Sequence, residues 1–165
     1  MAGVSYINNN PLIIKLESIK KEHGISGKFI FKLDLKLPIL MWQWKNTIIS
    51  SHLSQFEPFG LAPVEARLMA RDNGPVVVVS DRGGLKEQIL SFQDGYVAEY
   101  GKEASYEGII RSIFCKKQAE LKKMRKSAYA NVIKKYDSYE NIFILLTCVS
   151  PAIKDAYKKN GSNSK

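Results

Sequence analysis

Apolar residues recur at helical and strand-like intervals in the first fifty positions. Pro11–His23 carries them at helical spacing with lysines between, and Gly24 follows as a stop signal. Alternating residues predict a short strand at Lys28–Leu33, and the apolar run Thr47–Ile49 predicts a buried strand. The stretch Leu35–Trp44 is apolar but contains a proline, so the pattern leaves its structure open.

The middle of the chain alternates loops with helices and strands. Ser50–Gly60 is rich in turn formers and aromatic residues, and it leads into a predicted helix at Leu61–Ala70 whose first turn holds Pro63. The β-branched run Val76–Val79 is typical of a parallel strand that is covered on both faces. A second loop, Ser80–Gly84, follows it.

The same alternation continues to the end of the chain. It predicts a short helix, a short strand and three further helices: Leu85–Leu90, Gly95–Ala98, Tyr106–Phe114, Gln118–Tyr136 and Tyr139–Tyr157. The predicted fold class is therefore α/β, with a Rossmann-like, doubly wound parallel sheet.

Length and composition narrow the class of protein. A chain of 165 residues with 45% apolar and 25% charged residues is one globular domain. No apolar run approaches the roughly 20 residues that span a bilayer, and the N-terminus lacks a secretory signal pattern. We therefore expect a cytoplasmic protein with no membrane partner.

The cysteines and histidines give no sign of a metal site. Cys115 and Cys148 are too few for a disulfide framework, and we expect two reduced, largely buried thiols. His23 and His52 have no histidine or cysteine partner at ligand spacing. The sequence therefore predicts no bound metal and no cofactor.

Most of the positive charge lies near the C-terminus. From Lys116 onward there are twelve Lys or Arg against four Asp or Glu, which gives +8 of the net +9. Such asymmetry raises the alternative of a nucleic-acid-binding protein. These lysines lie opposite a predicted apolar helix stripe and are not interleaved with aromatic residues, so we favour an ordinary solvated helix face.

Two glutamates flank the junction between the first loop and its helix. Glu57 and Glu65 are eight positions apart, and Gly60 between them would let a ligand approach the backbone. A diphosphate could bind the open N–H groups at the helix start, with one carboxylate facing a sugar and the other a ribose. The alternative is that the two glutamates are ordinary acidic residues at a solvated helix start, which would give the same sequence pattern.

The residues around this pair resemble a known family. Ser54–Leu61, Glu65-Ala66, Gly74–Asp81 and Gly83–Glu87 are similar to the donor-binding stretch of retaining GT-B glycosyltransferases (glycosyl transferases group 1), which have two Rossmann-like domains. The motifs Glu-Pro-Phe-Gly-Leu and Gly-Gly-Leu-Lys-Glu most resemble those of glycogen and starch synthases. The resemblance is strong over Asn46–Ala98 and looser beyond it.

The resemblance implies a nucleotide-sugar partner, ADP-glucose or UDP-glucose, and transfer to an α-1,4-glucan without a metal. By motif match, Glu57 would be catalytic and contact the sugar, while Glu65 would bind the ribose. The other implied donor-binding residues are Phe59, Gly60, Leu61, Gly83, Gly84 and Leu85. Arg82 and Lys86 are possible phosphate contacts.

The chain also departs from that family. The Arg and Lys that neutralise the diphosphate in a Gly-Arg-Leu segment have no counterpart before Asn46, and three extra residues, Arg71–Asn73, precede Gly74. We expect residues 1–45 to be a truncated or divergent N-terminal part, 46–136 the nucleotide-sugar-binding core, 137–160 a C-terminal helical segment and 161–165 a disordered tail. The acceptor would bind a missing domain or separate subunit, so we expect the chain alone to be inactive. A donor-binding module or fragment without transferase activity is the alternative.

Overall fold

The computed structural model describes residues 11–24, 35–71, 73–90 and 92–137. It contains two compact units, Met1–Gln43 and Trp44–Lys165. The predicted strand at Lys28–Leu33, the predicted helix at Tyr139–Tyr157, the tail from Gly161 and Cys148 lie outside the described residues.

The first unit contains the predicted N-terminal helix. Helix α1 spans Pro11–Glu22, which confirms the prediction from apolar spacing. The stretch whose structure the sequence left open forms helix α2, Leu37–Lys45, most of which belongs to this unit. Pro38 occupies the first turn of α2, where its missing N–H removes no helical hydrogen bond.

The second unit is built on a parallel sheet of three described strands. Strands β1 (Ile49–His52), β2 (Val76–Ser80) and β3 (Tyr96–Ala98) are neighbours in that order. Helix α3, Leu61–Met69, connects β1 to β2, and the 3₁₀ turn η3, Lys86–Gln88, lies between β2 and β3. Helices α4 (Glu103–Cys115) and α5 (Gln118–Lys135) follow. This confirms the predicted α/β class with a parallel sheet.

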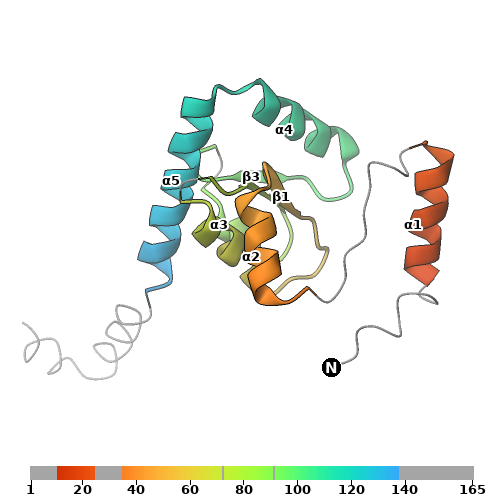
Figure 1. Cartoon of the computed structure of the whole chain (residues 1–165), viewed down its shortest axis with the longest axis horizontal. Helices are drawn as coiled ribbons and strands as arrows, with labels where there is room; N and C mark the ends of the chain where they lie inside the picture. Colours follow the sequence, from red (N-terminus) through yellow and green to blue (C-terminus); the bar gives the residue numbers. More distant parts are fainter. Residues whose placement is uncertain (1–10, 25–34, 72, 91, 138–165) are drawn as a thin grey trace, which may run out of the picture. The chain divides into compact units, whose positions relative to one another are not determined.

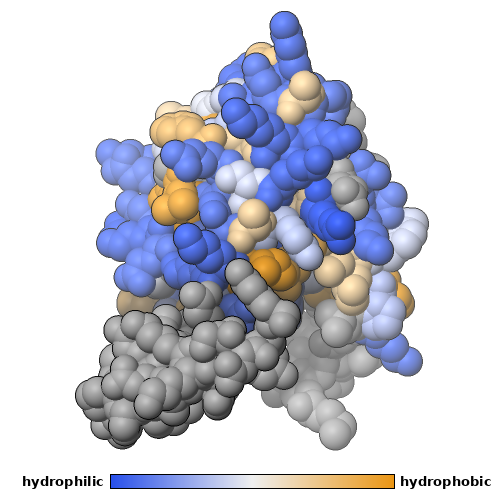
Figure 2. All heavy atoms as spheres, turned by 90° about the vertical axis from the view of Figure 1, so that its left-hand side faces the viewer, coloured by the Kyte–Doolittle hydropathy of each residue, from blue (hydrophilic) through white to orange (hydrophobic). Residues whose placement is uncertain are grey.

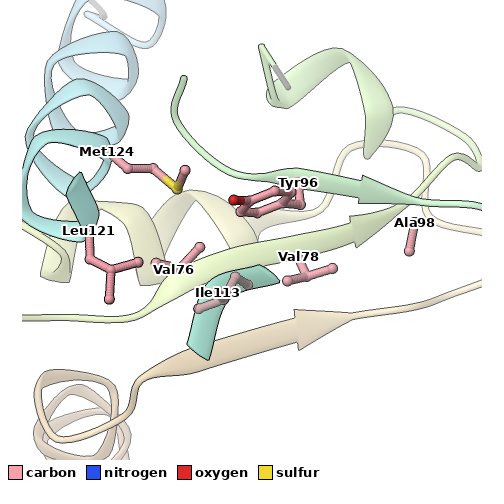
Figure 3. Packing of buried hydrophobic residues seen from close by; sticks show 7 residues of the cluster. All are labelled: Val76, Val78, Tyr96, Ala98, Ile113, Leu121 and Met124. Atoms are coloured by element: carbon pink, nitrogen blue, oxygen red, sulfur yellow. The ribbon is translucent and has the colours of Figure 1, made fainter. Parts of the chain in front are cut away.

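The core gathers around β2. All five residues of this strand are buried, as the β-branched run predicts for a strand covered on both faces. On one face, Val76 and Val78 pack with Ile113 of α4 and with Leu121 and Met124 of α5. Figure 3 shows this cluster, in which Met124 points toward the ring of Tyr96 on β3.

The other face of β2 is covered as well. Val77 and Val79 point away from that cluster and are also buried. Helix α3 packs on β1, β2 and α5, and Figure 1 shows α3 below strand β3 and α4 above it. This layering of helices on both faces of a parallel sheet is the doubly wound pattern.

Three details of the predicted elements are wrong. The strand predicted at Thr47–Ile49 instead runs over Ile49–His52, because backbone pairing with β2 continues through polar residues and Ile48 is 50% exposed. The short α-helix predicted at Leu85–Leu90 is the three-residue 3₁₀ turn η3, because Ile89 adopts an extended backbone.

The third error concerns Cys115, which is exposed rather than buried. Ile113 of the same helix is fully buried against the sheet. Two residues later along a helix a side chain points about 200° away, so the inward position of Ile113 turns Cys115 toward solvent.

Helix α5 carries six of the twelve Lys and Arg residues from Lys116 onward. Leu121, Met124, Ala128 and Val132 form its buried stripe, as their spacing predicts. The lysines on its other sides are mostly exposed, and Figure 2, which views the side of the molecule where α5 lies, shows a largely hydrophilic surface. The lysines thus form a solvated face of the helix.

Candidate functional site

Three loops meet at the carboxyl edge of the sheet. Since the strands are parallel, the loops that begin at Leu53, Asp81 and Glu99 all leave from the same edge. Ser80 Oγ donates a hydrogen bond of 2.7 Å to the carbonyl of Ser54, which joins the first loop to the end of β2. The Tyr100 N–H donates to Asp81 Oδ1 at 3.0 Å, which joins the third loop to the second.

The first two loops pack backbone against backbone. The Gly84 N–H donates to the carbonyl oxygen of Glu57 at 3.0 Å. A Cβ added at Gly83 would lie 2.4 Å from that oxygen, and one added at Gly84 would lie 2.2 Å from the Pro58 oxygen. Both distances are far inside van der Waals contact, so the two glycines are required for this approach.

The same loop forms the start of α3. Gly60 precedes the first helical residue with φ +77°, a left-handed conformation that favours glycine. Its N–H donates to Glu57 Oε1 at 3.0 Å. The next N–H groups, of Leu61 and Ala62, have no partner within the helix because they belong to its first turn. With the helix dipole, they offer a place for an anion.

Buried side chains support the helix start from behind. Leu85 is 1% exposed, and a Cβ added at Gly60 would lie 2.6 Å from its Cδ2 atom. The Gln88 amide nitrogen donates to the carbonyl oxygens of Phe59 and Gly60, the latter at 3.0 Å. Leu85, a predicted ligand contact, therefore does not present its side chain to the surface.

A hollow of about 440 Å³ opens beside Glu57. Arg82 Cζ lies 5.5 Å from the centre of the Tyr100 ring, within cation–π range, and Arg82 Nε lies 3.4 Å from Asp81 Oδ1. The hollow thus places a carboxylate, a guanidinium and an aromatic ring together. Its lining residues are Gln55, Phe56, Glu57, Pro58, Arg82, Gly83 and Tyr100.

The predicted site residues occupy different positions around this edge. Glu57, Arg82 and Gly83 line the hollow. Glu65 is half-buried in the second turn of α3 and does not line it. It lies about 6 Å along the axis from the first helical residue. Lys86 is exposed at the start of η3.

The rim of the helix start is apolar. Phe56 is 86% exposed, Leu61 64% and Phe59 46%. The Phe59 ring also makes an edge-to-face contact with Tyr136, with centroids 5.6 Å apart. The exposed rings and the Leu61 side chain leave apolar surface beside the open N–H groups.

Sequence reasoning missed Tyr100 and Gln55 at the hollow. The Tyr100 hydroxyl lies 3.4 Å from Gln55 Oε1, which links the third loop to the first. A signal was present for Tyr100, since it is the second residue after a predicted parallel strand and loops at the carboxyl ends of such strands form ligand crevices. Gln88 was missed as well, although it directly follows the Gly83–Glu87 stretch that carries the resemblance.

His52 lies just before the first loop, at the end of β1. Its Nε2 is 2.9 Å from Ser50 Oγ. Burial lowers the pKa of His52 to about 4, and the Glu57 carboxylate opposes that shift. His52 is therefore neutral at physiological pH.

Among the described residues, no three His, Cys, Asp or Glu side chains are grouped so as to hold a metal ion. No helix in the described part of the chain is long and apolar enough to cross a membrane. The expectation that no metal or cofactor takes part stays a prediction.

The family to which the chain belongs is decided by its sequence. The model of the family "Glycosyl transferases group 1" matches residues 9–131, which include the three strands and the loops described above. The chain belongs to the glycosyl transferases group 1 family. No curated protein matches the sequence significantly.

Solved glycosyltransferase structures have the same fold as this group 1 chain. Anabaena Alr3699/HepE in complex with UDP-glucose is 18% identical with a TM-score of 0.65, over 92% of this chain and 38% of that chain. Sucrose-phosphate synthase from Thermosynechococcus elongatus is 18% identical with a TM-score of 0.70, over 88% and 35%. The C-terminal domain of the group 1 protein LpcC from Francisella tularensis is 22% identical with a TM-score of 0.64, over 78% and 64%.

These likenesses establish the fold of the C-terminal, Rossmann-like domain of GT-B glycosyltransferases. The match spans little more than a third of the Anabaena and Thermosynechococcus proteins.

Proposed function

We propose that this domain binds the nucleotide-sugar donor of a retaining glycosyltransferase that extends an α-1,4-glucan, with ADP-glucose or UDP-glucose as donor. The observation that carries the proposal is the start of α3 at the carboxyl edge of the sheet. There, open N–H groups, an adjoining carboxylate and a hollow with a guanidinium lie together.

The diphosphate would bind at the N–H groups of Leu61 and Ala62. A helix N-terminus favours an anion through both its unpaired donors and its dipole. Arg82 lines the adjoining hollow and could add a positive charge, in place of the Arg and Lys that the family carries in its Gly-Arg-Leu segment. Lys86 is a further candidate, since it is exposed one residue after Leu85.

The two glutamates would contact different parts of the donor. Glu57 lines the hollow, so its carboxylate can face the sugar and stabilise positive charge that develops on the transferred sugar in the transition state. Glu65 lies about one turn into α3 and outside the hollow, and would accept hydrogen bonds from the ribose hydroxyls.

The choice of a glucose donor and an α-1,4-glucan rests on two sequence motifs. Glu57–Leu61 and Gly83–Glu87 resemble glycogen and starch synthases, which use glucose donors and retain anomeric configuration. Anabaena Alr3699/HepE, which has this fold, was solved with UDP-glucose and with UDP and glucose. Both findings support a uridine or adenosine diphosphate glucose as ligand.

Transfer itself would need an acceptor-binding partner. The solved relatives are much longer than the part that this chain matches. Catalysis depends on holding donor and acceptor in reacting geometry with water excluded. We therefore expect the purified 165-residue chain to bind donor but to transfer no glucose unless an acceptor domain is added.

Titration calorimetry with UDP, ADP and their glucose adducts tests donor binding. Glu65→Ala should weaken all four ligands, by about tenfold for the loss of a charge-assisted hydrogen bond. Glu57→Ala should weaken the glucose adducts more than the bare diphosphates. Glu120→Ala is a matched control, since Glu120 is exposed on α5 and does not line the hollow.

Two outcomes would count against the proposal. If none of the four ligands gives heat or a thermal shift at millimolar concentration, the domain has no donor site. Equal losses for sugar-bearing and bare ligands in both glutamate variants would remove the division of roles between Glu57 and Glu65.

A further inference from the structure

We propose that Gln88 is a positioning residue for the anion site: its buried amide holds the two peptides on either side of Gly60, so that the Gly60 N–H meets Glu57 and the Leu61 N–H faces the ligand. The proposal rests on the donor-binding function above. Gln88 is 4% exposed and does not line the hollow beside Glu57, so it acts through the backbone that it holds.

Two peptide groups take their orientation from this side chain. The Gln88 Nε2 group donates hydrogen bonds to the carbonyl oxygens of Phe59 and Gly60. In a planar trans peptide the C=O and N–H bonds point in opposite directions. Holding these two carbonyls inward therefore directs the N–H groups of Gly60 and Leu61 outward.

One of these two outward N–H groups, that of Leu61, is a donor that the diphosphate would use, and the other meets Glu57. The Gly60 N–H meets the Glu57 carboxylate at 3.0 Å, so this donor already faces a negative charge. The Leu61 N–H is the first of α3 and has no helical partner. One buried amide therefore bonds to both of the peptides that carry these donors.

The chemistry of the side chain fixes which end of the amide faces the carbonyls. Two carbonyl oxygens need donors, and the amide carries its donors on nitrogen alone. Among the described residues, Gln88 Oε1 is buried without a hydrogen-bond partner. The two hydrogen bonds made by the nitrogen offset the cost of burying the oxygen without a partner.

A buried ion pair fixes Gln88 from its backbone side. Arg67 Nη1 donates to the Gln88 carbonyl at 2.7 Å, and Arg67 pairs with Asp94, with both side chains at most 1% exposed. Asp94 also accepts from the Leu90 N–H at 2.7 Å and from Asn131 Nδ2 at 3.1 Å. Elements distant in sequence thus hold Gln88 in one place.

The experiment uses the full chain and measures UDP affinity by calorimetry alongside the thermal midpoint. Gln88→Met keeps the length of the side chain but removes the donor, and should weaken UDP binding about tenfold. Gln88→Glu places a carboxylate against two carbonyl oxygens and should weaken it further at pH 7.5. Lowering the pH should partly restore UDP binding to Gln88→Glu, because a protonated carboxyl regains an O–H donor.

Ile113→Val is the control for a merely structural effect. It trims the core on the face of β2 that α4 covers, so it should lower the thermal midpoint and leave UDP affinity unchanged. Wild type measured at each pH corrects for titration of the ligand itself.

The outcomes separate this inference from the donor-binding function. If wild type binds UDP and both Gln88 variants bind it equally well, the positioning role is wrong and the function stands. The positioning role is also wrong if Gln88→Glu shows no recovery at low pH relative to wild type, or if Ile113→Val loses as much affinity as Gln88→Met. If wild type itself does not bind, the donor-binding function fails.

Discussion

Gly84→Ala adds a single methyl group at the closest backbone contact of the site. The new Cβ would lie 2.2 Å from the Pro58 carbonyl oxygen and 3.4 Å from Phe59 Cα. An ordinary contact with that oxygen needs more than about 3 Å, so the loop before α3 must move by about 1 Å. The Gly84 N–H bond to the Glu57 carbonyl, now 3.0 Å, would lengthen with it.

The expected cost is of the size seen for overpacking, about 1–3 kcal/mol. For a chain of this length that corresponds to a fall in thermal midpoint of roughly 2–12 °C. Because the moved segment carries Glu57 and the start of α3, UDP affinity should fall at temperatures where the variant is still folded. Scanning calorimetry and titration calorimetry measure the two effects separately.

Gly108→Ala is the matched control for the same chemical change. A Cβ at Gly108, in α4, would meet nothing within 4 Å. Alanine is the better helix former by about 1 kcal/mol, so this variant should be as stable as wild type or more so, with unchanged affinity. A Gly84→Ala protein with wild-type midpoint and wild-type UDP affinity would refute the requirement for glycine at this contact.

Two further predictions concern buried ionisable side chains. The folded pKa of His52, about 4, lies below its unfolded value of 6.5. Between these pH values the unfolded chain binds more protons than the folded one. The free energy of unfolding should therefore fall by up to about 3 kcal/mol as the pH drops from 6.5 to 4. Urea titrations at several pH values should show that the free energy of unfolding depends less on pH in His52→Gln than in wild type. The same pH dependence in both proteins would contradict the burial of a neutral His52. Arg67→Met should lower the free energy of unfolding by about 3–5 kcal/mol, since it leaves Asp94 charged and buried. Arg67→Met/Asp94→Leu should regain part of that loss, and a double variant no more stable than Arg67→Met would oppose this account.

The hydrophobic pattern predicted the frame of this protein well where burial is periodic. Four consecutive valines required a strand covered on both faces, and the stripe from Leu121 to Val132 required a helix against the core. Parallel strands then place the loop with Glu57 and the loop with Arg82 at one edge, which is why part of the site could be predicted.

Other features depended on contacts between segments far apart in the chain. Strand β1 continues through Ser50, Ser51 and His52 because backbone pairing with β2 needs no apolar side chain. Cys115 is exposed because the rotation of α4 is set by Ile113. Neither fact can be read from local composition.

The support of the site was likewise decided by tertiary structure alone. Gln88 bonds to carbonyls 28 and 29 positions earlier, and Arg67 pairs with a carboxylate 27 positions later. The amino-acid sequence by itself determines which side chains can donate or accept, through the chemistry of each residue. Which peptide a buried amide meets depends on how the loop before α3 packs against η3, because hydrogen bonds require the partners to be within about 3 Å of each other.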